Sequence, residues 1–281
     1  MRILLFLLSC MVFLSPLSAG GMKEQTDGKP VVAVTIVPEQ TFVRKVAGEV
    51  CDVVVMVPPG SSPETYEPTP RQKVEMEKAS VYFAIGVPSE MAILPSVRKE
   101  TTLVHLEDIV RESYPDLLLG TERDPHIWLS VKRVIVMIDA IVEQLSLSFP
   151  AYKEQFAENG AQYKAELLDA DGEIRSSLSA VKTKEFVVYH PAFGYFADEY
   201  GLTQFALEEE GKEATPRHMA EMVDLARSRG LKVIFYQAET DSRQSMAFAE
   251  DGGGVAVKLE PLSADYTENL KKMAAAFREA R

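Results

Sequence analysis

Five polar side chains of the kinds that bind metal ions stand at or near the ends of predicted structural elements. They are Glu64, His126, His190, Glu239 and Glu260. Four of them follow short runs of β-branched residues, and the remaining histidine stands in the segment DPHIWLS, just before a predicted helix. Ligands of parallel sheets bind beyond the carboxyl ends of the strands, so we expect these side chains to converge. Imidazole and carboxylate groups together suit zinc, manganese or ferrous iron, and the sequence therefore predicts a divalent transition-metal site.

Each histidine also has a structural explanation that the residues alone leave open. His190 stands at a strand end before a proline and could make an ordinary hydrogen bond there. His126 could cap the helix that follows it or bridge backbone groups. His105 lies in a strand-like segment and His218 in the first turns of a predicted surface helix, so we assign neither of them a role.

The loop PPGSSPETYEPTP, residues 58–70, holds Glu64 among five prolines and shows no apolar periodicity. Because proline fixes φ, these prolines lower the entropy of the loop before any ligand binds. The loop would then present Glu64 to a metal at little ordering cost. The alternative is a plain rigid surface loop with an exposed glutamate.

Motifs for other chemistries are missing from the sequence. It contains no G-x-S-x-G segment, no phosphate-binding glycine-rich loop and no H-E-x-x-H pattern. Two carboxylates could form a glycosidase pair, but a single tryptophan offers little aromatic surface for sugar stacking. The net charge of −12 disfavours nucleic acid and anionic membranes as partners, because both require a basic footprint.

The elements that must position the candidate ligands alternate between strand and helix. Short β-branched runs occupy the ranges 31–37, 51–57, 81–86, 185–190, 232–237 and 254–260. This alternation predicts an α/β protein with βαβ units and mostly parallel sheets, arranged as two Rossmann-like lobes. Between the lobes, apolar residues recur at helical spacing from Val131 to Leu145 and, after Pro150, in a second stretch from Phe156 to Val181. They predict a long, rigid connector helix, although Gly160 and Gly172 weaken the prediction that this helix is unbroken.

The expected domain organisation follows from these patterns. We predict an N-terminal α/β lobe at 21–150, the connector helix at 151–182 and a C-terminal α/β lobe at 183–281. Residues 1–20 are typical of a signal peptide, because one basic residue precedes an apolar run that ends in small residues. A retained membrane anchor is the alternative, but the run is shorter than the ~20 residues that a span needs. Lipid attachment at Cys10 is a further possibility.

Taken together, these segments resemble the solute-binding proteins of ABC transporters for zinc and manganese, the ZnuA/TroA-like family. The segments VMVPPGSSPETYEPTP, DPHIWLS and YHPAFGYFADEYGL are similar to the first three metal loops of that family. The segments GKEATPRHMAEMV and KLEPLSADYTENL are similar to its later parts, in the same order. The resemblance covers essentially the whole mature chain, and it includes the long central helix.

The resemblance implies a role for each candidate ligand. His126 and His190 fall on the second and third ligand positions of the family, and Glu260 on the position where a terminal aspartate is usual. Glu64 stands where the family usually has histidine, which is a departure. Exchanging imidazole for carboxylate shifts a site towards harder cations such as manganese or iron. Glu239 competes with Glu260 for the fourth position.

The resemblance also implies a function. We expect an exported, periplasmic, monomeric protein that captures a divalent metal in a cleft between its lobes, zinc first and manganese next. It would deliver the ion to an ABC transporter membrane permease without any bond chemistry. Two other classes stay open. A metal-dependent hydrolase would need an open coordination position and a general base, which Glu239 could supply. An exported adhesin-like protein with a decayed metal site would explain the loss of the first histidine.

Overall fold

The computed structural model describes residues 28–208, 213–239 and 243–279. The predicted signal peptide at 1–20 and the possible lipid attachment at Cys10 lie outside the described residues. None of the helices within the described ranges combines the length and the apolar composition that crossing a bilayer requires.

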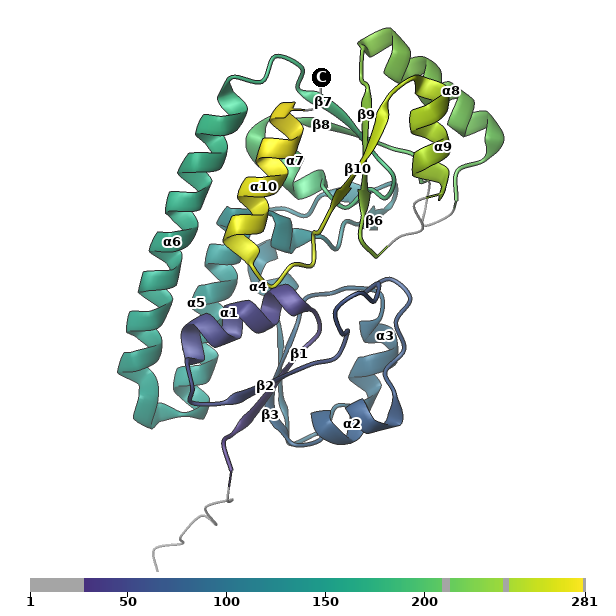
Figure 1. The fold of residues 1–281 in the computed structure, drawn as a ribbon. Helices are drawn as coiled ribbons and strands as arrows, with labels where there is room; N and C mark the ends of the chain where they lie inside the picture. The colour runs from purple at the N-terminus through teal and green to yellow at the C-terminus, as the bar shows by residue number, and fades with distance from the viewer. Residues whose placement is uncertain (1–27, 209–212, 240–242, 280–281) are drawn as a thin grey trace, which may run out of the picture.

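Two four-stranded sheets form the two halves of the protein (Figure 1). The first sheet, in the half that we call the N-lobe, has the order β2-β1-β3-β4, and the second, in the C-lobe, has the order β10-β9-β7-β8. Neighbouring strands within each sheet are parallel. The strands are β1 (Val31–Val34), β2 (Asp52–Val55), β3 (Ala79–Ala84), β4 (Thr102–His105), β7 (Glu185–Val188), β8 (Thr203–Ala206), β9 (Val233–Gln237) and β10 (Val255–Leu259). The predicted fold class, two α/β lobes with parallel sheets, is confirmed.

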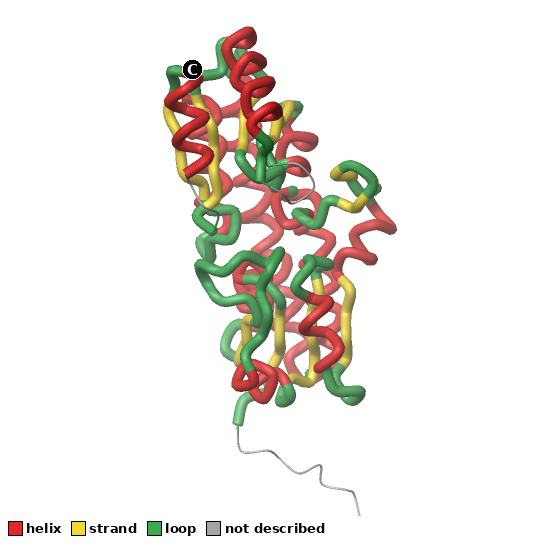
Figure 2. Tube along the Cα trace, turned by 90° about the vertical axis from the view of Figure 1, so that its right-hand side faces the viewer, coloured by secondary structure: helices red, strands yellow, loops and turns green. Residues whose placement is uncertain are grey.

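The helices flank the sheets and run between them. They are α1 (Val37–Ala47), α2 (Pro70–Met76), α3 (Glu90–Ile93), α4 (Leu106–Ser113), α5 (Val131–Ser148), α6 (Lys153–Ser179), α7 (Gly194–Tyr200), α8 (Pro216–Arg229), α9 (Arg243–Gly252) and α10 (Tyr266–Glu279). Short 3-10 helices occupy Leu94–Ser96, Ile127–Leu129 and Pro150–Tyr152, and β5 (Leu118–Leu119) pairs antiparallel with β6 (Glu122–Arg123). Figure 2 shows the strands of the two four-stranded sheets in two groups, one towards each end of the molecule, with helices between them.

The edge strand β8 is missing from the predicted set of strands. Its sequence TQFA contains a single large apolar residue, and most of the strand is partly or fully exposed. The central strands are easier to recognise because both of their faces are covered, which produces near-continuous apolar runs such as VYFA in β3. The strand-like surroundings of His105 prove to be β4, the edge strand of the N-lobe sheet.

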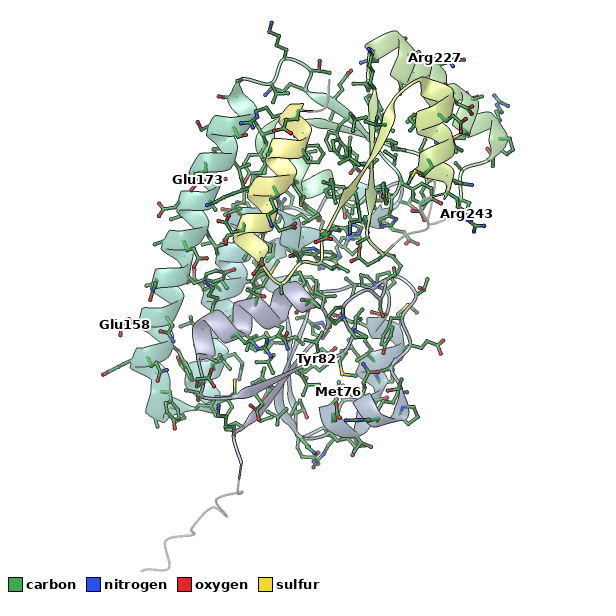
Figure 3. All side chains as sticks on the ribbon, viewed as in Figure 1. Met76, Tyr82, Glu158, Glu173, Arg227 and Arg243 are labelled. Atoms are coloured by element: carbon green, nitrogen blue, oxygen red, sulfur yellow. The ribbon has the colours of Figure 1, made fainter. Side chains whose placement is uncertain are left out.

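The helix α6 runs for 27 residues alongside both lobes (Figure 1). At 1.5 Å per residue it is about 40 Å long. It packs against α1, α5 and α10, through a buried face made of Phe156, Gly160, Tyr163, Leu167, Ala170, Ile174 and Leu178. Glu158 and Glu173 project from its outer side, whereas Tyr82 lies inside the N-lobe (Figure 3). The predicted connector is therefore confirmed as one continuous helix.

Neither glycine interrupts α6, and only one of them has a packing role. Gly160 is buried, and a Cβ atom placed on it would lie only 2.4 Å from Val142 Cγ2 of α5. Gly172 faces open space, with nothing within 4 Å of such an atom. The missing side chain at Gly160 therefore lets α5 and α6 approach closely, and this local requirement is why the helix tolerates a poor helix former there.

One large apolar core extends through both lobes. It includes Val32 and Phe83 of the N-lobe sheet as well as Val188 and Phe235 of the C-lobe sheet. A smaller core fills the space between the C-lobe sheet and the helices α8 and α9. Because the larger core is shared, rotating one lobe as a rigid body against the other would expose buried apolar surface, at about 25 cal/mol per Å². A wide hinge-like opening is therefore disfavoured.

Candidate metal site

Three potential ligand atoms converge where the two lobes meet. The Nε2 atoms of His126 and His190 are 3.3 Å apart. Glu64 Oε1 lies 3.6 Å from the first of these atoms and 3.8 Å from the second. Atoms that bind one zinc ion at about 2.1 Å in tetrahedral geometry are about 3.4 Å apart. The structure therefore brings together three of the five predicted ligands, at separations that one metal ion would span.

Two hydrogen bonds of the backbone hold the loop around Glu64 in place. The backbone N–H of Glu64 donates to Ser62 Oγ, at 3.2 Å. The N–H of Ser89, which precedes α3, donates to the carbonyl oxygen of Pro63, at 2.9 Å. The Glu64 side chain is 31% exposed, yet its Oε1 atom is buried and has no hydrogen-bond partner. A buried carboxylate oxygen without a partner is unfavourable unless a cation or donor satisfies it.

His126 is held by the aspartate two residues before it. Asp124 Oδ1 accepts a hydrogen bond from the backbone N–H of His126, at 2.9 Å, and lies 2.7 Å from its Nδ1. Both side chains are almost fully buried. The carboxylate therefore keeps the proton on Nδ1, and the lone pair of Nε2 faces the other two ligand atoms. The helix that follows is capped by Ser130 Oγ, which accepts from the N–H of Arg133, so His126 does not cap it.

His190 has a matching partner from the neighbouring strand. Its Nδ1 atom lies 2.5 Å from Oε2 of Glu208, which follows the edge strand β8. Burial acts to lower the pKa of His190, but the hydrogen bond to Glu208 and the nearby negative charges, including that of Glu64, outweigh it. The pKa of His190 is therefore raised, and a metal ion must compete with a proton for this imidazole.

The partners Asp124 and Glu208 are site residues that the sequence analysis missed. Carboxylates on the second nitrogen of a ligand histidine fix its tautomer and make it a stronger donor. The spacing of DPH, with an acid two residues before the histidine, offered a signal for the first. Glu208 offered none, because the strand that positions it was itself not predicted. Together with Glu64, these two partners place three carboxylates around two imidazoles, a concentration of negative charge that a divalent cation would balance.

The two candidates for a fourth ligand do not join this group among the described residues. Glu260 is about half exposed and pairs with Lys258, at 2.9 Å. Glu239 is more enclosed, its Oε2 atom is buried without a hydrogen-bond partner, and burial together with the charge of Glu260 raises its pKa. The choice between Glu239 and Glu260 stays a prediction.

A second group of possible ligands lies at the beginning of α4. His105, Glu107 and Asp108 each offer an atom within 4.8 Å of the others. Asp108 already pairs with Arg111, at 2.8 Å. Acidic side chains in a first helical turn stabilise the positive end of the helix dipole, which disfavours a cation at the same place. We therefore assign this group a structural role, and His218 likewise has no place in the candidate site.

Two parallel-sheet lobes with a buried pair of histidines and a carboxylate at their junction define a two-lobed metal-binding protein. A family model described as zinc-uptake complex component A, periplasmic (ZnuA), matches residues 32–280. The chain therefore belongs to the ZnuA family, which confirms the resemblance that its loops indicate.

Individual relatives agree with this assignment. Zinc-binding lipoprotein AdcA of Streptococcus pneumoniae is 28% identical over 267 residues, which cover 89% of this chain and 53% of the relative. The chain thus spans about half the length of that protein. High-affinity zinc uptake system protein ZnuA of Bacillus subtilis is 26% identical, covering 91% of this chain and 85% of the relative. A crystal structure of ZnuA is 30% identical with a TM-score of 0.85, and the match covers 90% of this chain and 99% of the other.

Proposed function

We propose that this protein captures a divalent transition metal between its lobes and delivers it to the membrane permease of an ABC importer. The observation that carries the proposal is the separation of the three ligand atoms, 3.3 to 3.8 Å, around one point. The carboxylates paired with Nδ1 of each histidine support it, because Nε2 is then the ring nitrogen that each histidine presents to the site. Membership of the ZnuA family favours transport over the hydrolase and adhesin alternatives.

Zinc is the leading cargo and manganese the second. The relatives described above are named for zinc, and two imidazoles suit that ion. The carboxylate of Glu64, in place of a third imidazole, increases the relative affinity for manganese or ferrous iron. The fourth ligand comes from the C-lobe, and the buried, unpartnered oxygen of Glu239 makes this residue a strong competitor to Glu260.

Cargo release involves the loop around Glu64 more than a rotation of the lobes. The apolar core shared by the lobes supports this mechanism, since wide opening would expose it. We further propose that the protein acts outside the cytoplasm, in the periplasm, as a monomer. The sequence of residues 1–20, which is typical of an export signal, supports this location.

The test is a competition titration of the metal-stripped protein with zinc and with manganese. Wild-type protein should bind one ion per chain, with zinc the tighter of the two. The Glu64→Ala variant should bind both ions at least about 100-fold more weakly, more than the loss expected for a residue that only orients a ligand. Glu67→Gln, an exposed carboxylate in the same loop, is the matched control and should bind like wild type. The absence of saturable binding to either ion would refute the proposal.

A further inference from the structure

The chain segments that carry the two histidines lead into two helices. His190 is followed, four residues later, by Gly194, where α7 begins. His126 is followed, four residues later, by Ser130, the residue that caps α5. The positions of α5 and α7 relative to each other therefore influence the separation of the two imidazoles.

Glu199, in the last turn of α7, is hydrogen-bonded directly to the start of α5. Glu199 Oε2 accepts a hydrogen bond from Ser130 Oγ, and Glu199 Oε1 accepts one from the backbone N–H of Lys132, at 3.1 Å. The Glu199 side chain is only 1% exposed, and Arg175 of α6 lies 3.7 Å from it. The buried carboxylate of Glu199 thus accepts a hydrogen bond from the N–H of Lys132, one of the first N–H groups of α5, which have no partner within the helix.

At the first turn of α7, Gly194 lies against Asp124, the carboxylate that pairs with His126. A Cβ atom placed on Gly194 would lie 2.6 Å from Asp124 Oδ2 and 3.8 Å from Asp124 Cγ. The missing side chain at Gly194 therefore creates the space that the aspartate occupies. The other oxygen of the same carboxylate lies 2.7 Å from Nδ1 of His126. Both ends of α7 thus contact the segment that holds His126.

We propose that Gly194 and Glu199 are positioning residues that fix the two histidines at metal-binding separation before the metal arrives. The inference rests on the proposed function, because it assumes that His126 and His190 bind the ion. A positioning role of this kind needs ligand placement within about 0.5 Å, which only packed and hydrogen-bonded elements provide. The helix α7 supplies such a contact at each end, and it begins four residues after His190.

Another pair of contacts holds the His126 segment from the C-terminal side. Trp128 Nε1 donates to the carbonyl oxygen of Pro261, at 3.0 Å, and the hydroxyl of Tyr266 donates to the carbonyl oxygen of Trp128, at 2.5 Å. Because these contacts remain when α7 is altered, we expect a partial loss of affinity. Removal of either α7 contact should weaken metal binding by about tenfold, at the low end of the effects seen for residues that orient ligands.

The experiment uses Co²⁺ as a probe, bound to the full mature chain, with Gly194→Ala and Glu199→Ala as the main variants. Affinity is measured by titration, and the ligand geometry is measured from the visible absorption bands of the bound Co²⁺. Both variants should lose about tenfold in affinity and show altered bands. Glu199→Gln should restore most of the affinity, because an amide can serve both Ser130 and Lys132.

The controls separate a positioning role from a general loss of stability. Gly172→Ala adds the same methyl group in open space on α6, and Glu39→Gln changes a buried carboxylate of the N-lobe. Both should leave the Co²⁺ bands and the affinity as in wild type, whatever their effect on the melting temperature.

Two outcomes would overturn different proposals. Wild-type protein that fails to bind Co²⁺, zinc or manganese would overturn the proposed function itself. Wild-type binding with unchanged affinity and bands in both α7 variants would overturn the positioning role alone, even if both variants melt earlier. If Glu199→Ala does not fold, Ser130→Ala breaks the same bond from the other helix, and Gly194→Ala remains an independent test.

Discussion

The two sides of the candidate site are held in different ways. His126 and His190 are buried, and each has a carboxylate on its second ring nitrogen. Glu64 is 31% exposed, has no such partner, and belongs to a loop whose described hydrogen bonds stay within the N-lobe. The two histidines, which we call the imidazole side, are therefore positioned before a metal binds. Glu64, the carboxylate side, can adjust its position to the ion.

This division also determines which residues lose conformational freedom when a metal binds. The histidines lose little freedom when a metal binds, because their orientation is already set by hydrogen bonds. The remaining ordering cost lies in the loop at 58–70, where the prolines reduce it. Rigid histidines together with an adjustable Glu64 would allow tight metal binding and still permit release.

The largest expected effect comes from breaking the imidazole side completely. The double variant His126→Ala and His190→Ala should show no saturable zinc binding. In wild type, zinc at 100 times its dissociation constant should stabilise the fold by about 2.7 kcal/mol, because the ion binds only the folded state. The double variant should lose this stabilisation. Thermal unfolding with and without zinc measures it, and equal zinc-induced shifts in both proteins would contradict the comparison.

The next largest effect should follow from removing one carboxylate partner at a time. Asp124→Asn and Glu208→Gln keep the shape of each side chain but remove its negative charge, which makes the histidine a weaker donor. Each substitution should lower zinc affinity by about 10- to 100-fold in a competition titration. If either variant lost more affinity than Glu64→Ala, the histidine partners would contribute more to binding than Glu64 does, and the division into two sides would be wrong.

A third prediction concerns α6, the helix that runs alongside both lobes. Gly160→Ala should destabilise the protein by about 1–3 kcal/mol, because the new methyl group would overpack against Val142. Gly172→Ala is the matched control on the same helix, and it should stabilise by about 0.5–1 kcal/mol through helix propensity. Urea unfolding of the metal-free variants measures both changes. Opposite signs are expected, and a neutral Gly160→Ala would show that α5 and α6 pack more loosely than described.

The smallest expected effect concerns Glu39, a buried carboxylate outside the candidate metal site. Changing it should alter the stability of the fold but not the affinity for metal. Burial, followed by the charge of Glu90, raises the pKa of Glu39 well above its ordinary value. A raised folded-state pKa contributes stability that is complete below the unfolded value, about 4.3, and is lost as pH rises through the folded value. The loss is at most about 1.4 kcal/mol per pH unit.

Glu39→Gln should remove this loss, so the variant should be more stable than wild type near neutral pH and its stability less dependent on pH. Urea unfolding over the range from about pH 4 to pH 8 measures the difference. Zinc affinity should not change, in contrast to Glu64→Ala. A variant whose stability falls with pH as steeply as that of wild type would contradict the assignment of this loss to Glu39.

The fold was largely predictable from the sequence because the central strands are covered on both faces and therefore continuously apolar. The edge strand β8 could not be recognised from TQFA, so Glu208 was missed with it. Glu64 and His190, which follow strands of the two parallel sheets, converge as the rule for parallel strand ends predicts, and His126 joins them from the loop before α5. Glu260 shows the limit of that rule, since it directly follows β10 but pairs with Lys258, two residues earlier. The path of a side chain beyond a strand end depends on such neighbours.

The confinement of the Glu64 loop to one lobe has an evolutionary consequence. The described hydrogen bonds that shape it join residues of its own segment and the adjoining Ser89 and Gln72. A substitution at Glu64, a candidate ligand, would therefore change the donor atom offered to an ion without disturbing the elements that hold the histidines. Under the proposed function, single mutations at this position would alter the preferred metal while the scaffold stays intact.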